Sequence, residues 1–206
     1  IVVPQMYTIN DLFQKVTGMQ VSDRVKLLLE LYECYKARNP KAEPLDEFIF
    51  WGDVILGDFN DVDKYLVDAG QLFANVADFK SIQDSFEYLT ETQRRAIEGF
   101  ISHFNDRSGR LTVDLRSDDP DVKARFLQIW NILHPLYEDY RRSLKEKGMA
   151  YEGMVYRELA EQLKNATVED VFKGVFPDDA FVMVGLNALN ECEKTLLRKL
   201  RDASMA

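Results

Sequence analysis

The chain has 206 residues, of which 46% are hydrophobic and 12% aromatic, and this content excludes a chain that is disordered throughout. Its 35 acidic residues outnumber its 26 basic ones, and the net charge of −9 is the opposite of the basic excess that free-standing nucleic-acid-binding proteins usually carry. No apolar run is long enough for a transmembrane helix, so no membrane association is expected. The widely spaced Cys34 and Cys192 are typical of reduced core thiols, which predicts a cytoplasmic protein.

The N-terminal part of the chain predicts a strand and a short helix. Ile1–Val3 is a β-branched run, which favours a strand. Thr8 stands three residues before Asp11, the spacing of a capping box, so a helix is expected over 9–17. Gly18 then provides the left-handed residue that ends a helix. Because the chain begins at Ile1 with no signal-peptide pattern, we expect it to be a segment of a longer protein.

Two longer helices are predicted next. One begins at Ser22 or Asp23 and ends near Asn39, and the other runs from Pro44 through Leu66. The apolar face expected for the first consists of Val25, Leu28, Leu29, Tyr32 and Tyr35. The face expected for the second consists of Phe48, Trp51, Ile55, Phe59, Val62 and Leu66.

The centre of the chain predicts short helical turns over 70–86 and a helix that begins at the capping box Thr90–Gln93. A loop over 105–117 follows. Asp119 and Pro120 are a strong helix start, since proline fits the first turn of a helix. The apolar seam of this long helix ends at Gly148 and consists of Phe126, Trp130, Leu133, Tyr137, Tyr140 and Leu144.

The C-terminal part predicts a helix over about 150–163, a short one from Thr167 to Gly174 and a last one opened by a capping box at Asn190. Phe181–Val184 is the second strand candidate. The chain is therefore expected to be mainly α-helical, with one small pair of strands.

The sequence contains none of the motifs that would identify a cofactor, metal or catalytic site. A phosphate-binding loop, an HExxH motif and paired CxxC motifs are absent, so no cofactor, metal or catalytic residue is predicted. The acidic run Asp58–Asp63 lacks the ligand spacing of a calcium loop, and we interpret it as a solvated helix face. His134 is predicted to be a partly buried core residue. A Cys–His pair brought together in space, involving His103 or His134, is disfavoured but stays open.

Basic residues gather in two helices, and both clusters allow two interpretations. Arg141 and Arg142 lie near the end of the long helix, and Arg198 lies in the last helix. Cations near a helix C-terminus are stabilised by the helix dipole, and this is the simpler explanation. Contact with phosphates is the second, and it makes these three arginines candidate DNA contacts.

Three stretches together resemble one family: VVPQMYTINDLF at the start, FIFWGDVILGDFNDVDKYLVD at 48–68, and AYEGMVYRELAEQL followed by FVMVGLNALNECEKTLLRKL at the end. The chain resembles the N-terminal, helicase-like part of AddB-type helicase–exonuclease proteins, above all the large Bacteroidetes members of the PD-(D/E)XK nuclease family. The resemblance implies a RecA-like α/β domain interrupted by a helical insertion. Residues 1–18 and 178–206 would then form a remnant of that domain, and 19–177 the insertion.

The resemblance also implies roles for single residues. Thr8 would lie along the single-stranded DNA track, and Phe181–Val184 would be the strand that carries the metal-binding acidic pair in active relatives. Gly185 and Leu186 stand at the positions of that pair, so the resemblance implies an inactive ATPase fold. Pro120-Asp121 and Pro177-Asp178 are not followed by the remaining residues of a nuclease site.

We therefore expect a non-catalytic fragment of a DNA-repair helicase- or exonuclease-like protein that supports DNA engagement or subunit contacts. The enzymatic status is open, because a parent protein could carry the nuclease. Expected partners are single-stranded or duplex DNA, the remaining domains of the parent chain and a helicase partner subunit. The alternative is a structural or protein-interaction helical domain with no nucleic-acid role. The first reading predicts that Ile1–Val3 and Phe181–Val184 lie side by side, covered by the helices at 9–17 and 191–202.

Overall fold

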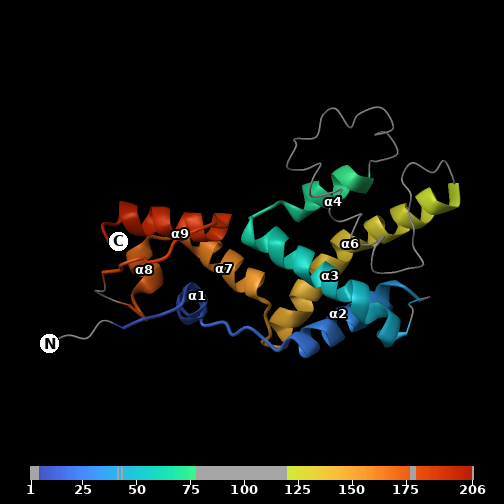
Figure 1. The fold of residues 1–206 in the computed structure, drawn as a ribbon, viewed down its shortest axis with the longest axis horizontal. Helices are drawn as coiled ribbons and strands as arrows, with labels where there is room; N and C mark the ends of the chain where they lie inside the picture. The colour runs from blue at the N-terminus through green and yellow to red at the C-terminus, as the bar shows by residue number, and fades with distance from the viewer. Residues whose placement is uncertain (1–4, 41, 43, 78–119, 177–179, 206) are drawn as a thin grey trace. The chain divides into compact units, whose positions relative to one another are not determined.

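The computed structural model describes residues 5–40, 42, 44–77, 120–176 and 180–205, and its regular structure is helical (Figure 1). The helices are α1 (Ile9–Thr17), α2 (Arg24–Arg38), α3 (Leu45–Lys64), α4 (Ala69–Ala77), α6 (Pro120–Glu146), α7 (Glu152–Asn165), α8 (Val168–Phe172) and α9 (Glu191–Asp202). The expectation of a mainly α chain is confirmed. The predictions for Ile1–Val3, the Thr90–Gln93 helix, His103 and the loop at 105–117 lie outside the described residues. Among the described helices, none combines the length and apolar content that a membrane span requires.

The described chain divides into two compact units. The first contains residues 5–27, 59–67, 144–176 and 180–205, and the second contains 28–58, 68–77 and 120–143. The predicted boundaries near 18 and 178 separate residues of a RecA-like domain from those of its insertion. A division into compact units does not test that prediction. Each unit is described below by itself.

Hydrogen bonds between residues close together in sequence fix the first turns of α1 and α9. In α1, Thr8 Oγ1 accepts a hydrogen bond from the Asp11 backbone N–H at 3.1 Å, and the Thr8 N–H donates to the Asp11 carboxylate. Asn190 and Glu193 form the same reciprocal pair at α9. These bonds satisfy backbone donors that a first helical turn leaves without partners. The capping boxes predicted at Thr8 and Asn190 are confirmed.

Helices α1, α3, α6 and α9 end in a left-handed residue, and two of these four residues are glycines; Gly18 after α1 has φ of 69°, as the sequence predicted. Gly148 follows α6 with φ of 64°, and the next residue, Met149, donates its N–H to the Leu144 carbonyl at 2.8 Å. Leu66 after α3 and Ser204 after α9 adopt φ of 54° and 56°. In both cases the N–H of the next residue donates to the carbonyl five residues before it, as Met149 does after α6. This is the Schellman motif, and a residue other than glycine is strained at its left-handed position. The sequence predicted the helix end at Gly148.

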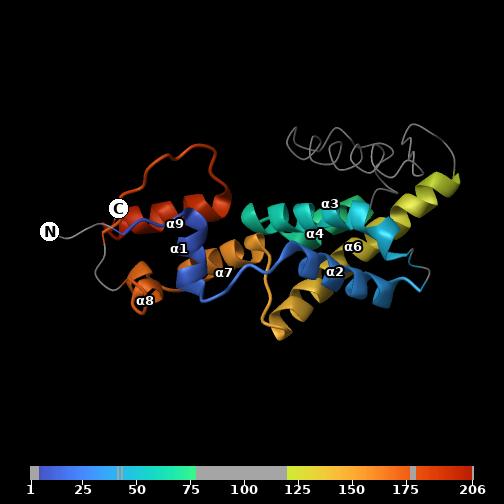
Figure 2. The ribbon, with the colours of Figure 1, turned by 60° about the horizontal axis from the view of Figure 1, so that its bottom comes forward.

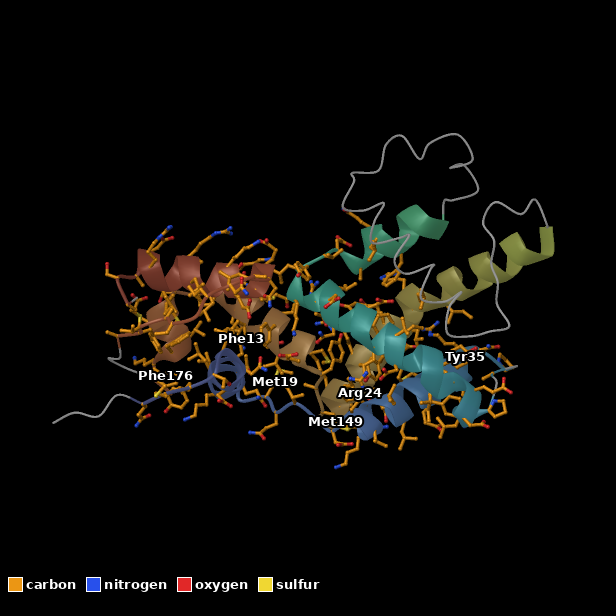
Figure 3. The ribbon with its side chains drawn as sticks, viewed as in Figure 1. Phe13, Met19, Arg24, Tyr35, Met149 and Phe176 are labelled. Carbon is orange, nitrogen blue, oxygen red and sulfur yellow. The ribbon has the colours of Figure 1, made fainter. Side chains whose placement is uncertain are left out.

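The core of the first unit is built around α7, against which α1, α8 and α9 pack (Figure 2). The ring of Phe13, labelled in Figure 3, stacks on Tyr156 of α7 with 4.0 Å between ring centroids. Leu12 of α1 and Leu196 of α9 are buried in this core. The two end helices were expected to cover a pair of strands, and for the described residues this is wrong, since they cover α7 instead.

The second unit buries aromatic and aliphatic side chains from α2, α3 and α6. Phe48 of α3 contacts two tyrosine rings of α2, at 4.9 Å to Tyr32 and 5.2 Å to Tyr35. The fully buried large side chains of this unit include Leu31, Phe48, Ile55, Leu136, Tyr137 and Tyr140. The predicted apolar face of α6 is confirmed where its side chains are described, and that of α3 is confirmed except for Leu66, which is half-buried and lies beyond the end of the helix.

The predicted apolar face of α2 is only partly right. Tyr35 is buried, but Val25 and Leu29 are exposed, and the residues that enter the core are Leu27 and Leu31. Apolar residues occupy more than half of the circumference of α2, so helical spacing alone allowed more than one choice of buried face. Packing against other helices decides which face is covered.

The prediction of a strand over Phe181–Val184 is wrong. These residues have no regular structure. The Phe181 N–H donates to the Met205 carbonyl at 2.7 Å, and its ring packs edge-on against Phe172 and Phe176. A strand needs a neighbour that pairs with its backbone groups, and the only ladder contact in the described residues is an isolated bridge between Val21 and Ala150.

Candidate functional site

A buried group of polar side chains lies at the C-terminal end of α3, in the first unit. The Asp63 side chain is fully buried, with one carboxylate oxygen 2.6 Å from Arg157 Nε. The Tyr151 hydroxyl donates to the other oxygen, and the Cys192 thiol donates to the Asp63 backbone carbonyl at 3.4 Å. We call these four residues, Asp63, Tyr151, Arg157 and Cys192, the Asp63 cluster.

Arg157 also binds backbone carbonyl groups at the C-terminal end of α3. Its Nη2 donates to the carbonyl oxygens of Val62 at 2.9 Å and Val67 at 2.7 Å. Backbone carbonyls at a helix C-terminus lack partners within the helix, and the helix dipole favours a cation there. Arg157 thus neutralises Asp63 and satisfies the carbonyls on either side of the strained Leu66.

The first turn of α7 lies unusually close to α3. The Gly153 N–H donates to Asn60 Oδ1 at 2.7 Å. A Cβ atom on Gly153 would collide with the Asn60 carbonyl oxygen and would lie 3.0 Å from the Asp63 Cβ. Lys64 and Glu152 form an ion pair of 2.7 Å beside this contact. The glycine is required here because only its missing side chain allows the two backbones to approach.

The Asp63 cluster has the chemistry of a structural site. Both Asp63 carboxylate oxygens are engaged by Arg157 and Tyr151, so neither is available to a substrate. Burial raises the pKa of the Cys192 thiol to about 12, so the thiol stays protonated and is a poor nucleophile at neutral pH. In the described ranges, no three His, Cys, Asp or Glu side chains are grouped so that they could hold a metal ion.

This cluster corrects the interpretation of the acidic run Asp58–Asp63 as a solvated face. Asp63 follows Phe59 by four residues and therefore lies on the buried side of α3, where both side chains are buried. That spacing is the signal in the sequence that could have identified it. Arg157, its partner 94 residues later, could not be identified, because no local pattern links the two positions.

Thr8, the DNA-contact candidate suggested by the resemblance, has its hydroxyl in the cap of α1. It accepts from the Asp11 N–H and lies 2.7 Å from the Asp11 carboxylate. The hydrogen bond from Thr8 lowers the pKa of the Asp11 carboxyl group. The local role of Thr8 is therefore accounted for by helix capping, although the residue is exposed.

Arg141 and Arg142 lie side by side in sequence on α6 but contact different partners. Arg141 Nη1 donates to the Tyr137 hydroxyl at 2.7 Å. Arg142 pairs with Asp139, and so does Arg38; the hydrogen bond from Arg38 is the main reason for the lowered pKa of Asp139. These contacts hold both arginines to side chains of their own unit.

Arg198, the candidate in the last helix, lies at the surface of the first unit. It is exposed on α9, and its spacing places it on the same side of the helix as Lys194 and Arg201. Lys194 pairs with Glu191 at 2.7 Å and Arg201 with Asp202 at 3.0 Å, so acidic residues interrupt this basic face. Thr8 and Arg198 belong to the first unit, whereas Arg141 and Arg142 belong to the second.

Gly185 and Leu186, the positions that the resemblance assigns to a lost metal-binding pair, lie in the irregular segment before α9. Gly185 has φ of 75°, and Leu186 is exposed. Neither side chain offers an oxygen that could bind Mg²⁺. His134 is half-buried, and its ring lies 6.1 Å from that of Phe73, as expected for a core histidine.

No family model matches this chain, and comparisons with curated proteins and with solved structures found no significant match. The resemblance to AddB-type proteins is therefore still a prediction.

Proposed function

We propose that the chain is a non-catalytic, cytoplasmic segment of a DNA-repair helicase- or exonuclease-like protein, where it supports contacts with DNA or with other subunits. In this proposal, 1–18 and 178–206 are the remnant of a RecA-like domain, and 19–177 are its helical insertion. The chemistry of the parent, including any PD-(D/E)XK nuclease, resides outside this segment.

The observation that carries the proposal is the exposure of an apolar stretch. Val182 and Val184 are each 87% exposed, although the sequence around them is a continuous apolar run. A contiguous exposed apolar segment is typical of a surface that another part of a protein covers. Exposure here is expected if the part that would cover these residues belongs to the rest of a larger protein.

The basic face of α9 supports the part of the proposal that concerns DNA. Arg198 is exposed on α9 between Lys194 and Arg201, and α9 begins at Glu191, shortly after the apolar stretch. The net charge of −9 opposes phosphate binding by the whole chain. Binding by this segment alone should therefore be weak and should decrease steeply with salt.

Fluorescence anisotropy with a labelled single strand of about 30 nucleotides, titrated between about 50 and 200 mM salt, tests the DNA contact. We expect Arg198→Ala to weaken binding and to reduce the salt slope by about 0.7, the value for one lost phosphate contact on a single strand. The matched control is Lys173→Ala, which removes an exposed cation from the turn after α8. Tight binding of the labelled strand at physiological salt that is unchanged when Arg141, Arg142 and Arg198 are substituted would contradict the proposal.

The alternative, a helical protein-interaction domain without a nucleic-acid role, is favoured by the acidic charge and by the ion pairs around Arg142. Absence of DNA binding even at low salt would support it. The reading frame on both sides of the chain separates the two functions independently: RecA-like flanks and a C-terminal nuclease motif are expected only for the first. Neither function includes ATP binding, so titration with labelled ATP and Mg²⁺ should show none at micromolar concentration.

A further inference from the structure

We draw no further inference here: the strongest candidate, the exposed apolar surface patch of Val182, Val184 and Leu186 in the irregular segment before α9, carries none because nothing in the structure shows what covers it.

Discussion

Replacing Arg157 with methionine should be among the most damaging single substitutions in the first unit. The substitution leaves the fully buried Asp63 carboxylate without its cation and removes the donor to the Val62 and Val67 carbonyls. Removing one partner of a buried ion pair typically costs about 3–5 kcal/mol, most of it from the charge that stays behind. We therefore expect the free energy of unfolding to fall by about that amount.

The measurement is urea unfolding followed by circular dichroism, combined with hydrogen exchange of the amides at the end of α3. Asp63→Asn removes the carboxylate but keeps an oxygen that can accept from Tyr151. The double variant Asp63→Asn/Arg157→Met should therefore cost at least about 2 kcal/mol less than the sum of the two single variants. The control is Arg142→Met, which breaks an exposed ion pair and should cost at most about 1 kcal/mol. If Arg157→Met costs no more than this control, or if the single effects add, the cluster does not hold α3 to α7.

The other predictions concern close backbone contacts, helix ends and the buried thiol. Gly153→Ala should destabilise the chain by about 1–3 kcal/mol in urea unfolding because its Cβ has no space, whereas Gly57→Ala, in open space on α3, should stabilise it by about 0.5–1 kcal/mol. Gly148→Ala should lower the free energy of unfolding by about 1 kcal/mol, and Ser204→Gly should raise it by at most about 1 kcal/mol. Changes of the opposite sign in thermal unfolding would contradict the left-handed helix ends. Cys192, with a pKa of about 12, should stay thiol and resist iodoacetamide at pH 8 in the native chain; mass spectrometry would show labelling only after unfolding. Native labelling of Cys192 would show that its burial is wrong.

Helix boundaries were readable from the sequence because the interactions that set them are local. Thr8 reaches Asp11 three residues later, and Asn190 reaches Glu193 in the same way. Gly148 ends α6 because a left-handed residue is required there. Each of these signals lies within about one turn of the position that it controls, so neighbouring residues suffice to predict it.

The candidate contacts for DNA were chosen by residue type and by resemblance, and the tertiary structure shows what else those side chains do. Arg142 already contacts Asp139, which Arg38 reaches from another helix. Thr8 is a helix cap. Arg198 keeps its exposed position on α9. Charge alone does not distinguish a cation that stabilises its own fold from one that is available to a partner.

Only the tertiary structure decided which apolar and which charged residues are buried. Periodicity placed Val25 and Leu29 of α2 in the core, but packing covered Leu27 and Leu31 instead. The apolar run favoured a strand at Phe181–Val184, yet in the described residues no strand lies beside it, and the Phe181 N–H bonds to the Met205 carbonyl instead. The reason is physical: burial and strand pairing depend on groups far away in the sequence, and one chain's periodicity contains no information about which partner reaches which face. Asp63 makes the point most directly, because its burial is possible only where Arg157 meets it.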